Sequence, residues 1–130
     1  MKIFIIENDI NTSHSLQAKF KVNNLEVVNC NIFLSIKEII EQIIEAQPDY
    51  IVHGFRFPNM DGFDLLHAIK SNKETMNIPV FVYTKLSDDK SKKKCADLGA
   101  EYFFSKKELN LEQFSEKVIK IIENRSKIKK

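Results

Sequence analysis

Five short apolar runs alternate along the chain with longer stretches in which apolar residues recur every three or four positions. The runs have the length of strands and are rich in β-branched and aromatic residues, a pattern typical of strands buried on both faces of a parallel sheet. The predicted strands cover residues 3–6, a weaker 26–30, 50–53, 80–84 and 102–104.

The stretches between these runs predict five amphipathic helices with recognisable ends. Ser35 and Glu38 form a capping box before the second helix, and Asn110 with Gln113 begins the last. Gly99 is the residue type that adopts the left-handed conformation after a helix end. The predicted helices cover about residues 11–22, 36–47, 62–71 and 88–98, and a last helix that begins at 111.

This alternation predicts an α/β fold, because parallel strands need crossover connections and helices then cover both faces of the sheet. The 130 residues suit one domain, 1–130, in which residues 125–130 form a basic tail that includes Arg125 and Lys130. Open sheets of this kind bind ligands at the carboxyl ends of their strands. The residues at those ends are Glu7, Asn8, Asp9, Gly54, Thr84 and Lys106.

The central segment, PDYIVHGFRFPNMDGFD over residues 48–64, reads as a buried strand, a loop and a helix capped by Asp61. It resembles the same segment of receiver domains from bacterial two-component response regulators, and the resemblance extends over essentially the whole chain. It implies a doubly wound (βα)5 fold with a five-stranded sheet in the order 2-1-3-4-5, which is flavodoxin-like and CheY-like.

The resemblance also assigns a role to each position after a strand. The family's acidic pair for Mg²⁺ corresponds to Glu7 and Asn8, with Asp9 following, so one carboxylate is an amide here. Its phosphate-contacting hydroxyl and lysine are present as Thr84 and Lys106. The phosphoacceptor aspartate, however, is replaced by Gly54.

Two further positions of strand five and its loop differ from the family. The switching aromatic residue corresponds to Phe103, which has no hydroxyl group. The proline that usually follows the conserved lysine is Lys107 here, and cis peptide bonds are largely confined to proline. We therefore do not expect the cis peptide of the family at this point.

Acyl-phosphate formation needs a carboxylate nucleophile, and a divalent cation neutralises the phosphoryl oxygens. Gly54 has no side chain, so we expect phosphoryl chemistry at the usual site to be lost. Glu7 and Asp9 remain as weak candidates for metal binding, and no cofactor is expected. Lys106 is instead predicted to pair with Glu7, or with Asp9, without metal and so to fix one conformation. The alternative is that these residues are relics without a role.

Three other residues are candidate nucleophiles in place of the missing aspartate. His53 is next to Gly54, but neighbouring strand side chains point to opposite faces, so it should face a helix layer. Asp61 is better explained as a helix cap, and Asp49 lies at the wrong end of its strand. No catalytic residue is assigned, and we do not expect an enzyme.

Composition places few further limits on function. The formal net charge of +2 is too small to indicate nucleic acid by itself. Cys30 and Cys95 lack CxxC or metal-ligand spacing, so reduced thiols are expected, without disulfide or zinc. No apolar run reaches the roughly 20 residues of a membrane span, and the N-terminus does not read as a signal peptide. A cytoplasmic location is therefore expected.

Lysines are concentrated around the fourth helix and its flanking loops. By resemblance, the fourth helix, fifth strand and fifth helix form the face that receivers use for dimers and output partners. Function is thus predicted to be phosphorylation-independent protein binding in two-component signalling, with a histidine kinase or another signalling protein as partner and a homodimer as a further possibility. The alternatives are a phosphorelay-responsive receiver that uses another residue or competes for a kinase surface, and a nucleic-acid-associated protein. The residues concerned are Lys85, Lys90, Lys92, Lys93, Lys94, Lys106 and Lys107, with Arg125, Lys127, Lys129 and Lys130 near the C-terminus.

Overall fold

The computed structural model describes residues 1–128 and shows one parallel five-stranded sheet in the order β2-β1-β3-β4-β5, as the resemblance implied. The strands are β1 (Lys2–Ile6), β2 (Glu26–Asn29), β3 (Tyr50–His53), β4 (Val80–Thr84) and β5 (Tyr102–Ser105). The helices are α1 (Ile10–Val22), α2 (Ile36–Ala46), α3 (Gly62–Ser71), α4 (Asp89–Asp97) and α5 (Leu111–Ile128).

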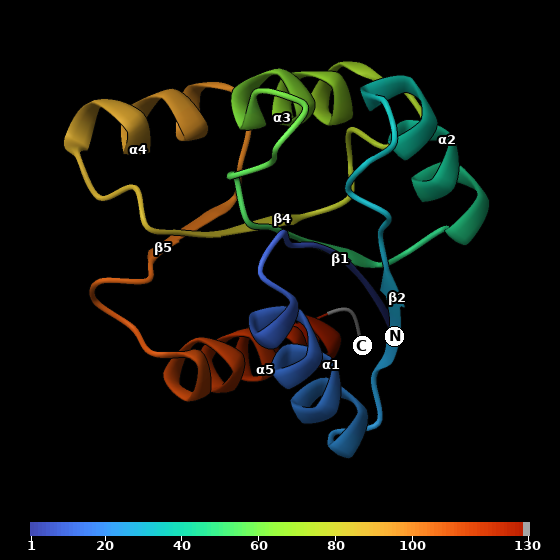
Figure 1. The fold of residues 1–130 in the computed structure, drawn as a ribbon. Coiled ribbons are helices and arrows are strands. Elements are labelled where there is room, and N and C mark those ends of the chain that lie inside the picture. Colours follow the sequence, from blue (N-terminus) through green and yellow to red (C-terminus); the bar gives the residue numbers. More distant parts are fainter. Residues whose placement is uncertain (129–130) are drawn as a thin grey trace.

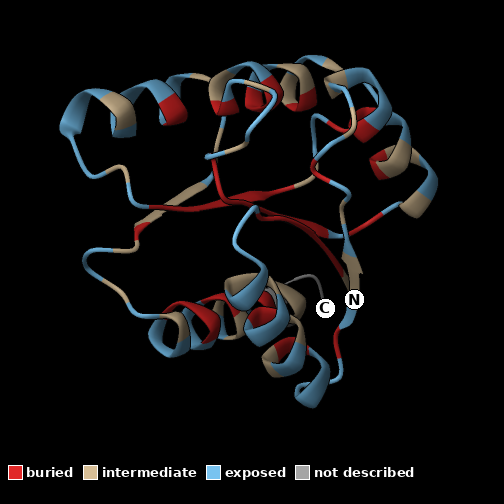
Figure 2. Cartoon of the chain, viewed as in Figure 1, coloured by how far each residue is buried: buried red, intermediate tan, exposed pale blue. Residues whose placement is uncertain are grey.

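The sheet is covered on both faces, with α1 and α5 on one side and α2, α3 and α4 on the other (Figure 1). Alternate strand residues supply the two cores: Ile3 and Val52 pack in the α1/α5 layer, whereas Phe4 and Ile51 pack in the opposite layer. The central strands are buried along their length, and each helix turns a buried stripe toward them (Figure 2). Burial on both faces is why the strand sequences read as continuous apolar runs.

The predicted helix ends are confirmed where local chemistry sets them. Ser35 and Glu38 form a complete capping box at α2. Asn110 and Gln113 exchange hydrogen bonds of 2.8 and 3.0 Å at the start of α5. Asp88 caps α4, and Gly99 beyond that helix has φ of +106°. Each cap satisfies amides or carbonyls that a helix end would otherwise leave without partners.

The predicted basic tail begins within a helix in the structure. Helix α5 continues to Ile128, and the Arg125 guanidinium donates a 3.4 Å hydrogen bond to the Tyr102 hydroxyl. It also lies 5.9 Å from the centre of the Tyr50 ring. The aromatic rings bind this cation against the end of the sheet, so it is part of the fold. Of the other basic residues of the predicted tail, Lys129 and Lys130 lie outside the described residues, and the side chain of Lys127 is not described either.

Candidate functional site

The carboxyl edge of the sheet brings together most of the residues that the sequence selected. β1 and β3 are neighbours at the centre of the sheet, so the residues that follow these two strands meet at one point. A small cavity of about 160 Å³ opens there. Its lining consists of Glu7, Asn8, Asp9, Gly54, Arg56, Lys85 and Lys106.

Glu7 occupies the space that a side chain at position 54 would need. Its side chain is only 4% exposed, and a Cβ atom placed on Gly54 would lie 2.9 Å from both Cδ and Oε2 of Glu7. Real Cβ atoms do not come so close to other heavy atoms. Glu7 and any larger residue at position 54 therefore exclude each other in this arrangement.

The predicted ion pair between Glu7 and Lys106 is confirmed. Lys106 Nζ donates to Glu7 Oε1 at 2.7 Å, and the other carboxylate oxygen accepts a 3.1 Å hydrogen bond from the backbone amide of Asp9. The lysine side chain is 18% exposed. The contact joins the ends of β1 and β5, which are 99 residues apart in sequence.

The other two residues of the predicted acidic pocket have different surroundings. Asp9 is the N-cap of α1, and its Oδ1 accepts hydrogen bonds from the amides of Asn11 and Thr12 at 2.9 and 3.1 Å. Asn8 lines the cavity with its neutral side chain. Among residues 1–128, no group of three or more His, Cys, Asp or Glu side chains is arranged to hold a metal ion.

Thr84 is placed at the end of β4 but does not line the cavity. It is fully buried, and its Oγ1 accepts a 3.3 Å hydrogen bond from the Leu86 amide. Phe103, on β5, is half-buried against the core on the α2/α3/α4 side. After Lys106, the chain continues with trans peptide bonds, since no cis bond occurs in the described part.

The residues set aside as nucleophiles are accounted for by structural contacts. His53 is fully buried with its ring against Phe55 and Phe57, and its Nδ1 accepts from the Phe55 amide at 3.1 Å. Burial lowers the pKa of His53 to about 3. Asp61 caps α3 through a 2.7 Å hydrogen bond from Phe63, and Asp49 accepts from the Lys2 amide at the opposite edge of the sheet. The predictions for these side chains are confirmed.

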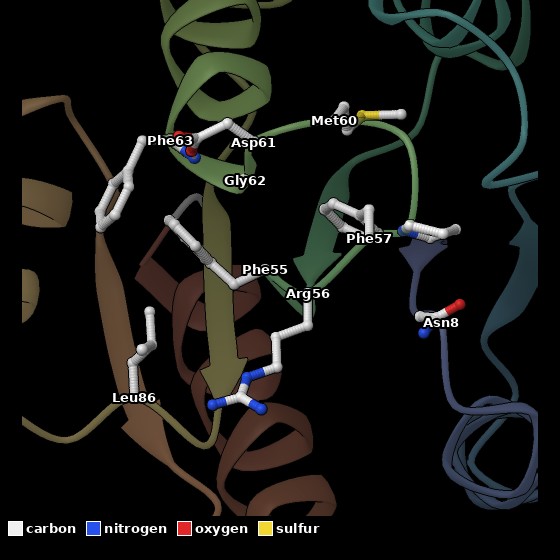
Figure 3. Close-up of a pocket in the computed structure, with 10 residues that line it drawn as sticks. Asn8, Phe55, Arg56, Phe57, Met60, Asp61, Gly62, Phe63 and Leu86 are labelled. Carbon is white, nitrogen blue, oxygen red and sulfur yellow. Dashed lines mark hydrogen bonds between the residues drawn. The ribbon is translucent and has the colours of Figure 1, made fainter.

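Two cations in the cavity lining were not recognised as site residues from the sequence. Arg56 was not considered, and Lys85 was counted only as part of the basic stretch. Arg56 is two residues beyond Gly54, and Lys85 directly follows Thr84, so their positions after β3 and β4 could have indicated them. Figure 3 shows Arg56 extending away from the aromatic side chains of its own loop.

Those aromatic side chains line a second, larger cavity of about 400 Å³, which shares Asn8 and Arg56 with the first (Figure 3). Phe55 has a φ of +74°, which is uncommon for a residue with a side chain. Gly62 permits this course of the loop, because a Cβ there would lie 2.4 Å from the Phe55 carbonyl oxygen. The loop conformation is thus fixed by packing next to the candidate site.

The remaining lysines are mostly exposed. Lys90, Lys92 and Lys93 are solvent-exposed on α4, whereas Lys94 lies 4.3 Å from the centre of the Phe63 ring. Both cysteines are free thiols, and burial raises the pKa of Cys30 to about 12. Within residues 1–128, no helix is both long and apolar enough to cross a membrane.

The family profile of the response regulator receiver domain matches residues 3–119. A cyclic di-GMP phosphodiesterase of Thermotoga maritima is 28% identical over 96% of this chain and 32% of its own length. The DNA-binding dual master transcriptional regulator RpaA of a Synechocystis species is 27% identical over 81% of this chain and 42% of its own. The chain thus spans less than half of these two relatives.

Solved structures show the same fold. A two-component response regulator from Clostridium difficile superposes with a TM-score of 0.79 at 23% identity, covering 95% of this chain and 96% of that one. The receiver domain of a DNA-binding response regulator from Colwellia psychrerythraea gives a TM-score of 0.77 at 25% identity, covering 95% and 98%. With the profile match over nearly the whole chain, the chain belongs to the response regulator receiver domain family.

Proposed function

We propose that this receiver domain acts as a protein-binding module in two-component signalling whose state does not depend on phosphorylation at the usual site. The observation that carries the proposal is the position of Glu7, which lies against Gly54 and is paired with Lys106. A carboxylate is already held beside the conserved lysine, but it comes from β1 and not from the end of β3.

The chemistry of the side chains supports the loss of phosphoryl transfer at position 54. An acyl phosphate forms on a carboxylate oxygen, and glycine offers none. The donor set also fits Mg²⁺ poorly, because this ion usually binds one or two carboxylates together with phosphate and water. Asn8 contributes an amide, Asp9 Oδ1 is engaged as a helix cap, and Glu7 is bound to Lys106. We therefore propose no enzymatic activity and no resident metal.

The same ion pair supports a fixed conformation of the domain. In the family, the lysine compensates acidic groups whose charge changes with metal and phosphate. Here the Lys106 ammonium has a permanent partner within hydrogen-bond distance, and both side chains are largely removed from water. An attraction of this kind is weakly screened by salt. We propose that it holds the ends of β1 and β5 together in all signalling conditions.

The exposed face of α4 and its flanking loops supports a protein partner of acidic character. Lys90 and Lys92 are exposed there, with Lys107 near the end of β5. A histidine kinase or another cytoplasmic signalling protein with a negative surface would complement this charge, which chiefly raises the association rate. A second copy of the chain is the alternative occupant of the face, and we do not propose nucleic acid.

Beryllofluoride, a phosphoryl mimic, tests the central claim. With Mg²⁺, we expect no change in the amide NMR shifts of Thr84, Phe103 and Lys106 in the unmodified chain. Gly54→Asp alone displaces the Glu7 carboxylate and still leaves Asn8 in place of the second lost carboxylate. The stronger test is therefore Gly54→Asp combined with Asn8→Asp, which restores both lost carboxylates. This double variant is expected to respond.

The matched control is Asn8→Asp alone, which restores a metal ligand without a nucleophile and should remain silent. A response in the unmodified chain would contradict the proposal and favour a phosphorelay-responsive receiver that uses another residue. Silence in the double variant would mean that the scaffold has lost more than its acceptor.

A further inference from the structure

The strand β2 forms one edge of the sheet, and part of its backbone faces outward. Among residues 1–128, β2 pairs only with β1, and it lies beside α2 at the outer edge of the fold (Figure 1). The amides of Glu26 and Cys30 donate inward to carbonyl oxygens of the N-terminal segment, both at 2.9 Å. The backbone groups of Val27 and Asn29, at the alternate positions of the strand, therefore point away from the sheet.

A groove of about 400 Å³ lies between this open edge and α2. On the sheet side it is lined by Phe4 and Val28, which pack in the core layer under α2, α3 and α4. On the helix side it is lined by Gln42, Glu45 and Ala46. A strand added to β2 would place every second side chain on this side of the sheet, next to Val28.

The surface beside the groove is negatively charged. Glu45 lines the groove, and Glu38 and Glu41 continue an exposed acidic stripe along the same face of α2. Among residues 1–128, none of the three has an ion-pair partner within 4.0 Å. The cation in the lining, Lys2, is already engaged, because its Nζ donates to the carbonyl oxygen of the last α2 residue at 2.7 Å and pairs with Glu26 at 3.6 Å. The groove therefore complements a basic partner.

We infer that β2 and this groove form a docking site for an extended segment of a partner protein in which basic and apolar residues alternate. Such a segment would join the sheet as a further strand and pair its backbone with the outward groups of Val27 and Asn29. Its basic side chains would lie along the groove, with their aliphatic stems on Val28 and their charged ends at Glu45. Its apolar side chains would lie on the opposite side, next to Val27, which packs against the α1/α5 core layer.

The sequence and surroundings of β2 favour this occupant over a second copy of the chain. Edge strands are commonly closed to new partners by lysine or proline, and the β2 sequence EVVN contains neither. Antiparallel pairing of two β2 strands would place both α2 helices, with the same acidic stripe, on one face of the combined sheet, where like charges repel. β2 and β5 are opposite edges of the sheet, so the site is separate from the α4 face and goes beyond the proposed function.

The experiment is a titration of the ¹⁵N-labelled chain with the blocked peptide Lys-Val-Lys-Val-Lys-Val-Lys. We expect saturable shift changes that are largest at the amides of Val27 and Asn29. Hydrogen exchange of these two amides should slow at least tenfold in the complex, because they gain carbonyl partners. Glu45→Lys should weaken the affinity at least tenfold. The matched control is Glu123→Lys, the same change at an exposed position on α5, which should alter the affinity less than twofold.

Two further peptides separate strand pairing from general attraction. Proline in place of the central valine keeps every lysine but removes a backbone donor, so this peptide should bind at least tenfold more weakly. Equal affinity, or an equal loss in Glu45→Lys and Glu123→Lys, would overturn the inference in favour of non-specific attraction to acidic residues. Binding of the peptide with glutamate in place of lysine, or the absence of saturable binding, would also refute it. Protection of Val27 and Asn29 that increases with protein concentration without peptide would assign the edge to a second copy instead.

Discussion

Two lysines with little exposed surface lie at opposite edges of the sheet, and each is paired with a glutamate. At the amino edge, Lys70 Nζ donates to Glu101 at 2.8 Å and to the carbonyl oxygens of Ile78 and Met76 at 2.8 and 3.2 Å. At the carboxyl edge, Lys106 Nζ donates to Glu7 at 2.7 Å, its one acceptor among residues 1–128.

This difference distinguishes a structural ion pair from an ion pair at a candidate binding site. An ammonium group has three donors, and Lys70 uses all of them within the protein. Glu101 is also engaged on both oxygens, since Oε1 accepts from the Val80 amide at 2.8 Å. Lys106 contacts one acceptor among residues 1–128 and lines a cavity together with Arg56 and Lys85. Unused hydrogen-bonding capacity next to a cavity indicates where a ligand can be bound, which a saturated pair does not.

The largest expected effect comes from removing the saturated ammonium. Lys70→Met leaves three acceptors without their donor, and we expect the free energy of unfolding to fall by about 2–3 kcal/mol. Lys106→Met is the matched variant, with a smaller expected loss of about 1–2 kcal/mol, because it removes one hydrogen bond where Lys70→Met removes three. Urea unfolding of both variants measures the difference. Equal losses would contradict the distinction between the two lysines.

A smaller effect is expected from His53, which is buried near the carboxyl edge and has no charged partner among residues 1–128. Its folded pKa of about 3 lies below the unfolded value near 6.5, so the unfolded chain binds more protons between these values. The contribution is fully present above pH 6.5 and is lost as the pH falls toward 3. The expected loss between pH 6.5 and 5 is about 1.5 kcal/mol.

His53→Asn removes the titration and keeps an acceptor for the Phe55 amide, so its stability should depend less steeply on pH in this range. His67→Asn is the control, because His67 is exposed on α3. Urea midpoints at several pH values would show the two slopes. A slope that His53→Asn leaves unchanged would mean that other groups dominate the acid sensitivity.

The sequence predicted features whose causes are local. The strand order came from resemblance, and the caps at Ser35 and Asn110 follow from side chains that reach amides three residues away. The pairing of Lys106 with Glu7 was also expected, because both positions follow strands and their charges are opposite. By contrast, the sequence did not predict that the last helix continues to Ile128.

The way side chains pack at the carboxyl edge of the sheet was not predicted. The Glu7 side chain can lie against Gly54 only because β1 and β3 are adjacent and no Cβ is present there. The Thr84 hydroxyl is engaged by the Leu86 amide outside the cavity, and periodicity contains no information about such a rotamer. Arg56 and Lys85 required the relative placement of two loops.

The smallest expected effect tests the contact between Glu7 and Gly54 directly. Gly54 has no positive φ, so alanine is compatible with its backbone, and the three atoms nearest to an added Cβ all belong to Glu7. Gly54→Ala should lower the free energy of unfolding by about 1 kcal/mol, because the added methyl group displaces the carboxylate from Lys106. In a Glu7→Ala background, the same substitution should cost less than about 0.5 kcal/mol, which a double-mutant cycle measures. Additive losses would show that the two positions do not compete for space. The proposal that Glu7 occupies the space of the missing acceptor side chain would then be wrong.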